Sequence, residues 1–218
     1  MKMKTVVCLP TYNEEESLQE MIDQIRGLGF DLFVVDAGSG DQTVAIAQQN
    51  RVPVYQRDGK GKGWGVRKAI AVAKQQGFDN LVLIDCDCTY PPQSIPDLLT
   101  HLPAYDMAVG QRRITDIPKR NRLPNKFFTA FVNLLFGSRL RDVNSGMRVF
   151  KVEGMPPLDA EEFEVEAQMT IRALKKKLKI KEVPIEYRVR KGETKVRVRD
   201  GFVILWGILK EKFGGCDG

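Results

Sequence analysis

The chain has 218 residues, of which 34 are Lys or Arg and 28 are Asp or Glu, for a formal net charge of +6. Hydrophobic residues make up 43% and charged residues 28%, which is typical of globular proteins and excludes a disordered chain. The single histidine, His101, excludes a multi-histidine zinc site and argues against a Ser-His-Asp triad. No signal peptide opens the sequence and no Cys-x-x-Cys pair occurs, so we expect a cytoplasmic protein with free thiols at Cys8, Cys86, Cys88 and Cys216.

No run of residues is apolar over the roughly 20 positions that a membrane-spanning helix needs. The longest apolar runs, residues 127–136 and 202–209, are about half that length. We therefore expect no spanning segment. The excess of positive charge suits a phosphate-bearing ligand or an anionic lipid surface.

The first 110 residues alternate short apolar strands with helices. Strands are predicted over residues 5–9, 32–35, 52–55 and 81–84; helices are predicted from Asn13 to Gly27 and over residues 43–49, 65–76 and 95–101. Strands that are apolar on both faces and alternate with helices indicate a mostly parallel sheet. Ligands of such sheets bind beyond the carboxyl ends of the strands, where the polar groups of residues 13–14, 36, 60–63 and 85–87 fall.

The second half is less regular. We expect strands over residues 107–110, 149–151 and 183–189 and helices over 126–136, 165–177 and 201–213, with a basic segment at residues 112–122. No repeat or linker interrupts the chain. The economical prediction is one α/β domain over residues 1–218, with a mostly parallel, Rossmann-like central sheet flanked by helices and an amphipathic C-terminal helix.

Asp85-Cys86-Asp87 directly follows the apolar strand predicted over residues 81–84. Two carboxylates there can face one cavity, and oxygen ligands without histidine suit Mg²⁺ or Mn²⁺ bridged to a diphosphate. Two solvated loop aspartates are the alternative. The buried strand before the pair and the Pro91-Pro92 turn after it favour the metal site.

The segment Gly59-Lys60-Gly61-Lys62-Gly63 is a basic, glycine-rich loop ahead of a helix. Glycines let a backbone approach a phosphate and lysines supply charge. The spacing is not that of a Walker A loop or of a dinucleotide-binding fingerprint. A phosphate-binding role and an exposed turn both remain open for this loop.

The motifs taken together resemble those of family 2 glycosyltransferases of the GT-A fold. In the first half, the resemblance rests on residues 10–14 (PTYNE), 34–41 (VVDAGSGD), 61–63 (GKG) and 85–87 (DCD). In the second half, residues 110–112, 142–148, 163–166, 182–185 and 190–195 resemble the polyprenol-phosphate (dolichol-phosphate) mannose synthase branch. Each motif is short, but their order from about residue 5 to residue 195 is specific.

The resemblance implies an enzyme that moves a hexose from GDP-mannose or UDP-glucose to a polyprenyl or dolichyl phosphate. It implies Mg²⁺ or Mn²⁺ on Asp85 and Asp87, which also hold the diphosphate. The residues implied to bind the nucleotide-sugar further include Pro10, Tyr12, Glu14, Asp36 and Lys62. The residues implied to bind the phosphates are Arg112, Arg148, Arg190 and Lys195, and those implied in catalysis are Asp87, Arg112, Arg190 and Lys195.

Two positions depart from the family pattern. Ala37 stands where a second aspartate is common, which bears on contacts to the donor base, and Thr89 stands where a glutamine can add a metal ligand. A phosphate acceptor is mostly dianionic at neutral pH and needs no strong general base, which fits a chain with one histidine. We therefore expect in-line displacement with inversion. Glu166 either orients a sugar hydroxyl or is structural.

The apolar helices predicted over residues 126–136 and 201–213 lie beside lysines and arginines. Such helices suit either peripheral contact with the cytoplasmic face of a membrane or packing in the core. A saccharide acceptor is the alternative to a lipid phosphate; it requires a carboxylate base, and Asp142, Glu164 and Glu166 are the candidates. A homologue that binds nucleotide-sugars without catalysis is a further alternative, whereas no motif for binding nucleic acid occurs.

Overall fold

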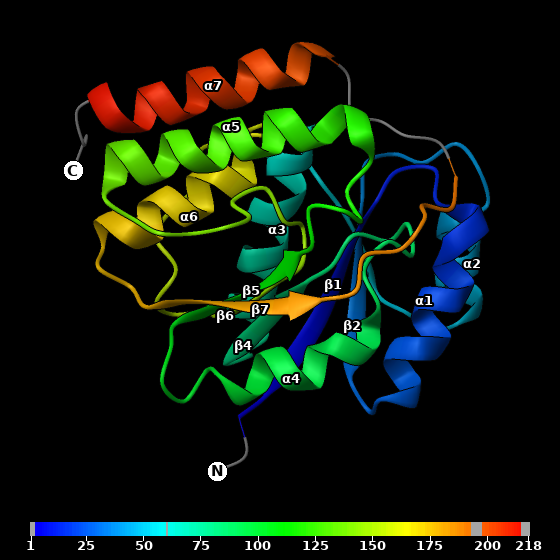
Figure 1. Ribbon diagram of the computed structural model, residues 1–218. Coiled ribbons are helices and arrows are strands. Elements are labelled where there is room, and N and C mark those ends of the chain that lie inside the picture. Colours follow the sequence, from blue (N-terminus) through cyan, green and yellow to red (C-terminus); the bar gives the residue numbers. More distant parts are fainter. Residues whose placement is uncertain (1–2, 60, 193–197, 215–218) are drawn as a thin grey trace.

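The computed structural model describes residues 3–59, 61–192 and 198–214 (Figure 1). The strands are β1 (Thr5–Thr11), β2 (Asp31–Asp36), β3 (Val54–Gln56), β4 (Asn80–Leu83), β5 (Met107–Arg112), β6 (Arg148–Lys151) and β7 (Ile180–Ile185). In this part of the chain they form one seven-stranded sheet in the order β3-β2-β1-β4-β6-β5-β7. Only β6 runs antiparallel to its neighbours, so the predicted mostly parallel α/β sheet is confirmed.

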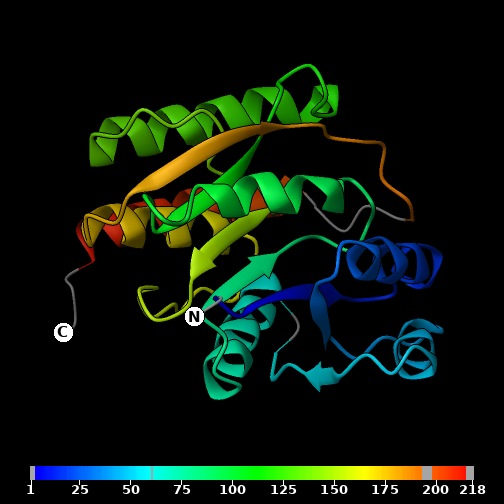
Figure 2. The same cartoon turned by 90° about the horizontal axis from the view of Figure 1, so that it is seen from below.

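Helices cover both faces of the sheet (Figures 1 and 2). They are α1 (Glu15–Gly27), α2 (Thr43–Gln49), α3 (Lys62–Gln75), α4 (Ile95–Thr100), α5 (Lys119–Phe136), α6 (Val165–Lys175) and α7 (Val198–Phe213), with a 3₁₀ turn η1 (Pro92–Ser94) before α4. Helices α1, α2 and α4 share one hydrophobic cluster with the sheet, and α3 and α6 share the other. None of the helices within these described ranges is long and apolar enough to cross a bilayer.

Strand β1 shows why the sheet is buried on both sides. Val7 and Leu9 point into the cluster with α1, whereas Val6 and Cys8 point into the cluster with α3. All four side chains are at most 2% exposed. A strand whose alternate residues are all apolar has to lie between two layers of helices, as the sequence predicted.

Helices α5 and α7 form a further layer that packs on α6 rather than on the sheet (Figure 1). Val132 of α5, Ile171 of α6 and Ile208 of α7 are each 0% exposed and belong to the same cluster. The prediction that these apolar helices pack in the core therefore holds for one face of each. Their other faces are exposed and are considered below.

Several boundaries differ from the sequence prediction. Helix α1 begins at Glu15, because Asn13 has a φ of 51° and its side chain accepts a hydrogen bond from Gly40 N instead of capping the helix. Helix α5 begins at Lys119 and includes Pro124, so the end of the predicted basic segment, residues 119–122, belongs to it. Pro124 lies inside α5, beyond its first turn, where a proline removes one hydrogen bond of the helix.

The strand predicted over residues 183–189 ends at Ile185. Beyond it, the chain continues extended alongside the loop that follows β4. Arg188 N donates to Thr89 O at 2.8 Å and Lys191 N donates to Asp87 O at 3.0 Å. Residues 186–189, whose alternating pattern predicted a strand, thus lie against the loop after β4 and not beside a neighbouring strand.

The glycines before Trp64 allow close packing between α3 and the segment that precedes α6. Gly63 N donates to Glu161 O at 2.9 Å, and a Cβ atom on Gly63 would lie 2.2 Å from Ala160 O. On Gly61, a Cβ atom would lie 2.0 Å from Glu161 O. A phosphate contact and an exposed turn were both open for this loop; in the structure its glycines make room for another stretch of backbone.

We predict that Gly63→Ala lowers the free energy of unfolding by about 1–3 kcal/mol, because the new methyl group forces Ala160 and its neighbours away from α3. Urea denaturation measures the change. Gly27→Ala is the matched control, since a Cβ atom there meets nothing within 4 Å and alanine favours a helix. Equal stability of the two variants would contradict the packing explanation.

Candidate active site

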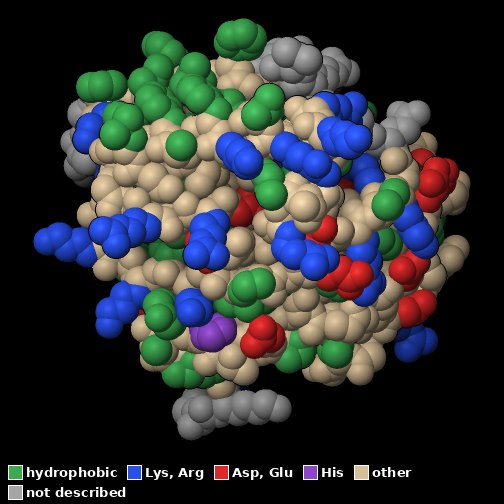
Figure 3. All heavy atoms as spheres, viewed as in Figure 1, with side chains coloured by type: hydrophobic (Ala, Val, Ile, Leu, Met, Phe, Trp, Pro, Cys, Tyr) green, Lys and Arg blue, Asp and Glu red, His purple; other side chains and the backbone are tan. Residues whose placement is uncertain are grey.

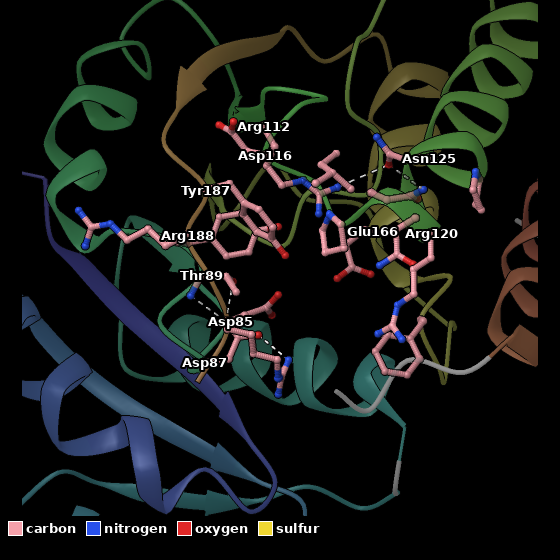
Figure 4. A pocket seen from close by; sticks show the side chains of 18 of the residues that line it. Asp85, Asp87, Thr89, Arg112, Asp116, Arg120, Asn125, Glu166, Tyr187 and Arg188 are labelled. Carbon is pink, nitrogen blue, oxygen red and sulfur yellow. Dashed lines mark hydrogen bonds and ion pairs between the residues drawn. The ribbon is translucent and has the colours of Figure 1, made fainter. Parts of the chain in front are cut away.

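A cavity of about 950 Å³ opens at the carboxyl ends of the parallel strands (Figure 4). Residues from the end of β1, the loop after β4 and the segment after β7 line one side of it, whereas α5 and α7 contribute to the other. Figure 4 shows Asp85 and Asp87 on one side and Asn125 and Arg120 across from them. The cavity therefore lies where the sequence placed a ligand site.

The two aspartates after β4 both face this cavity. Thr89 holds one oxygen of Asp87: its backbone N and its hydroxyl donate to Oδ1 at 3.0 and 2.5 Å. Arg190 Nη1 binds the other oxygen, Oδ2, at 2.5 Å. Burial, followed by the nearby charge of Asp85, raises the pKa of Asp87, and the charge of Arg190 opposes this.

Lys62 lies at the start of α3 and links two carboxylates across the cavity. Its Nζ atom is 2.7 Å from Asp85 Oδ1 and 2.5 Å from Glu166 Oε1. Burial alone lowers the pKa of a lysine, but here the charges of Asp85 and Glu166 outweigh it and the pKa is raised. Lys62 is therefore a fixed positive charge beside Asp85.

The residues expected to bind the nucleotide separate into two groups. Pro10, Tyr12 and Glu14 line the cavity, and the Tyr12 side chain is 45% exposed. Asp36 is 0% exposed and does not line it. Its carboxylate accepts from the hydroxyl of Thr11 and from the backbone N of Gly38 and Ser39. Asp36 thus shapes the loop after β2 from within the protein.

Arg112 enters the cavity at the end of β5, fixed by a bidentate ion pair. Its Nε and Nη2 atoms donate to the two oxygens of Asp142 at 2.7 and 2.8 Å. The Tyr187 ring lies 5.2 Å from the guanidinium carbon, a distance suited to a cation–π contact. Asn125 of α5 also donates to Asp142, at 3.2 Å. This network holds Arg112 in one orientation beside the cavity.

Arg148 does not reach the cavity, contrary to the role that the resemblance implied. It is 1% exposed at the start of β6. Its guanidinium donates to Ser145 O, Val143 O and the Thr170 hydroxyl at 3.0, 2.5 and 2.8 Å. These bonds tie the 142–147 loop to α6, which makes Arg148 a structural residue.

Arg190 lies beside the two aspartates that are expected to hold a metal ion. Besides Asp87, it binds Glu14 Oε1 through Nη2 at 3.0 Å. The guanidinium therefore joins the segment after β7 to the first β–α loop. Lys195, the other cation expected from this tail motif, lies outside the described residues.

Sequence reasoning missed several residues that line the cavity. Tyr90 and Tyr187 form an edge-to-face pair with ring centroids 5.0 Å apart, and the Tyr90 hydroxyl accepts from Gly146 N at 2.8 Å. Asn125 lies in α5, one residue before the start of the helix that was predicted over residues 126–136. Neither Asn125 nor the two tyrosines carried a signal in the sequence.

The donor set fits a divalent cation of the Mg²⁺ or Mn²⁺ type. Asp85 and Asp87 supply hard carboxylate oxygens, and in the described part of the chain no group of three or more His, Cys, Asp or Glu side chains forms a full protein cage. Mg²⁺ is commonly held by one or two carboxylates, with phosphate oxygens and water completing its shell. These residues therefore suit an ion that arrives with a diphosphate.

The sequence pattern of the family described as "Glycosyl transferase family 2" matches residues 6–156. The chain belongs to this family. This match covers β1, the Asp85-Cys86-Asp87 loop and Arg112, so the family resemblance seen in the sequence is confirmed. The GT-A fold is confirmed as well, because the solved structures that resemble this chain are glycosyltransferases of that fold.

Two relatives from Haloferax volcanii are each 33% identical to this chain. One, a low-salt glycan biosynthesis hexosyltransferase, aligns over 202 residues, covering 86% of this chain but 48% of the relative, so the chain spans about half its length. The other, a dolichyl-phosphate hexose transferase, aligns over 199 residues, covering 87% of this chain and 85% of the relative.

Among solved structures, glucosyl-3-phosphoglycerate synthase from Mycobacterium tuberculosis in complex with Mn²⁺, UDP-glucose and phosphoglyceric acid superposes with a TM-score of 0.80. The identity is 22%, and the match covers 96% of this chain and 80% of the other. At this identity the likeness concerns the fold.

We predict that Arg148→Met lowers the free energy of unfolding by about 2–4 kcal/mol, because it leaves buried oxygens of Ser145, Val143 and Thr170 without a donor. Urea denaturation again measures the change. Arg113→Met is the control, since the Arg113 side chain is 70% exposed and its loss should cost less than about 0.5 kcal/mol. A stable Arg148→Met protein would refute the structural role.

Proposed function

We propose that this protein is a metal-dependent, inverting hexosyltransferase that moves a hexose from a nucleotide-sugar to a polyprenyl or dolichyl phosphate. The carrying observation is the cavity, which runs from the carboxylates of Asp85 and Asp87 to an apolar and basic side formed by α5 and α7. Phe128 and Ile204 line that side together with Lys119, Arg120 and Arg122. Such a lining suits a ligand with a charged head and an apolar tail.

A phosphate acceptor explains how the reaction proceeds without a histidine base. An acceptor oxygen that is already anionic attacks the anomeric carbon, the bond from that carbon to the diphosphate breaks, and the electron pair leaves with the nucleoside diphosphate. A bound divalent cation supplies charge stabilisation for the leaving diphosphate. Arg112 and Arg190 orient the anionic groups, since guanidinium groups bind phosphates with two parallel hydrogen bonds.

The carboxylates of the second half support this acceptor over a saccharide hydroxyl, which needs a general base. Asp142 is 1% exposed and is paired with Arg112. Glu164 Oε1 accepts from the backbone N of residues 161 and 162, and Glu164 does not line the cavity. Glu166 does line it but is paired with Lys62. Asp142 is thus already paired, Glu164 lies away from the cavity, and Glu166 pairs with Lys62 in the donor-free protein.

The donor is expected to be GDP-mannose or UDP-glucose, bound with Mg²⁺ or Mn²⁺. Pro10, Tyr12 and Glu14 lie where the nucleotide would rest, with Asp85 and Asp87 beside its diphosphate. The resemblance to dolichyl-phosphate hexose transferase supports the lipid phosphate as the acceptor. A saccharide acceptor stays the alternative that the assay has to separate.

We predict that the protein transfers radiolabelled hexose to polyprenyl phosphate and not to free polyprenol or soluble saccharides. Asp87→Asn should lower kcat/KM at least about 100-fold, because it removes a charge from the metal-binding pair. The exposed Asp97→Asn on α4 is the control and should leave the rate unchanged. Transfer to a saccharide alone, or full activity of Asp87→Asn, would overturn the proposal.

The exposed faces of α5 and α7 support peripheral membrane contact at the cytoplasmic face. Figure 3 shows exposed hydrophobic side chains gathered at the top of the molecule, where Figure 1 places these helices, with lysines and arginines beside them. The most exposed are Leu123, Phe127 and Leu134 on α5 and Phe202, Trp206 and Phe213 on α7, each at least 53% exposed. Apolar residues rimmed by positive charge suit an anionic lipid surface, from which the acceptor would enter the cavity.

We predict that replacing Phe202 and Trp206 together by glutamate lowers the fraction bound to phosphatidylglycerol vesicles at least tenfold, because it puts charge where apolar area is buried. Co-sedimentation measures binding, with neutral phosphatidylcholine vesicles for comparison. Met3→Glu is the control, because Met3 is 55% exposed but does not lie on α5 or α7. If the wild-type protein binds neither the phosphatidylglycerol nor the phosphatidylcholine vesicles, membrane contact is refuted.

A further inference from the structure

Each of the two aspartates expected to bind the metal is already paired with a cation of this chain. Lys62 Nζ is 2.7 Å from Asp85 Oδ1, and Arg190 Nη1 is 2.5 Å from Asp87 Oδ2. Thr89 donates twice to the remaining oxygen of Asp87. Each aspartate therefore already has a cationic partner within the protein in this state of the site.

Lys62 is held on both sides. The second carboxylate that it contacts, Glu166 on α6, is 7% exposed and lies 2.5 Å from Nζ. The Lys62 side chain itself is 17% exposed. An ammonium group between two carboxylates occupies the kind of position that a small divalent cation takes between oxygen ligands.

A divalent cation and an ammonium group cannot share Asp85 at short range. Two like charges a few ångströms apart repel strongly where little water screens them. A cation that binds Asp85 alone has to displace Lys62, which costs the ammonium group one of its two carboxylate partners and leaves it with Glu166. A diphosphate changes this balance, because its oxygens offer Lys62 a new anionic partner within the same cavity.

We propose that Lys62 holds the place of the divalent cation in the donor-free protein, so that the cation binds tightly only together with a diphosphate. The exchange moves the ammonium group from Asp85 to the incoming phosphate while the cation takes its place on the aspartate. Arg190 makes the parallel exchange between Asp87 and a phosphate. This inference rests on the proposed function, since it concerns the same donor site.

The exchange predicts that removing the charge of Lys62 changes the affinities for the diphosphate and for the metal alone in opposite directions. Removing the charge of Lys62 weakens the binding of the diphosphate, which loses a cationic partner. The same change strengthens the binding of the metal alone, which loses a competitor. A residue with a purely structural role does not move these two affinities in opposite directions.

The test measures Mn²⁺ binding to the 218-residue chain in the absence of donor, by electron paramagnetic resonance of the free ion. Lys62→Met should bind Mn²⁺ alone at least tenfold more tightly than the wild type. In EDTA, the same variant should bind GDP or UDP at least tenfold more weakly by calorimetry. Lys62→Arg keeps the charge and should retain the weak Mn²⁺ binding of the wild type.

Two controls keep the test decisive. Lys74→Met removes an exposed lysine from the same helix and should change neither affinity. Lys62→Gln, whose amide can still contact the two carboxylates, should bind Mn²⁺ more tightly in the same way and replaces Lys62→Met if that variant does not fold. Because both affinities are measured without acceptor, their outcome is independent of the transfer assay.

The results have distinct meanings. Mn²⁺ binding by the neutral variants that equals or falls below that of the wild type would overturn the proposal while leaving hexosyl transfer untouched. Tight Mn²⁺ binding by the wild type without diphosphate would overturn it too. If no variant binds Mn²⁺ even with GDP or UDP, this inference fails together with the metal dependence in the proposed function.

Discussion

The burial of negative charge at the end of β4 is the constraint on which the rest of the site depends. Asp87 is 4% exposed, and a carboxylate in that position has to be neutralised and hydrogen-bonded. One partner, Thr89, belongs to the same loop, and the other, Arg190, comes from beyond β7. Lys62 brings the start of α3 to Asp85 in the same way. The segment after β7 and the start of α3 therefore meet at the end of β4, where their cations pair with the two aspartates.

The central sheet could be predicted because the hydrophobic pattern of its strands agrees with their burial in the fold. Strands such as β1 and β4 are apolar on both faces, so pattern and burial agree. The prediction failed where a long-range contact decides the local structure. Asn13 takes a positive φ to meet Gly40, and the segment after Ile185 leaves the sheet to bind the loop at Asp87 and Thr89. No short window of sequence contains such a partner.

For the site too, the sequence predicted what depends on local pattern and missed what depends on contacts in three dimensions. The sequence related Asp85, Asp87 and Lys62 to one ligand site because they lie at predicted strand or helix ends, and the family resemblance added Arg190; all four line one cavity. It could not distinguish an arginine that faces a cavity from one that faces buried carbonyl groups. Arg148 belongs to the second kind, with three oxygens around its guanidinium. Motif membership thus indicates where a residue lies more reliably than what its side chain contacts.

The formal charge of +6 suggests a surplus of cations for anionic ligands, yet the two cations beside Asp85 and Asp87 are already paired. Lys62 and Arg190 each contact two carboxylates, whereas Lys119, Arg120 and Arg122 line another part of the cavity. Beside the aspartates, attraction of a diphosphate by unpaired positive charge therefore explains little of its binding. An exchange of partners explains more: a divalent cation and a diphosphate bring opposite charges of similar size, so that each new ion pair replaces an existing one. Such a site discriminates against either ion alone, because one ion without the other breaks an existing ion pair and forms no replacement for it.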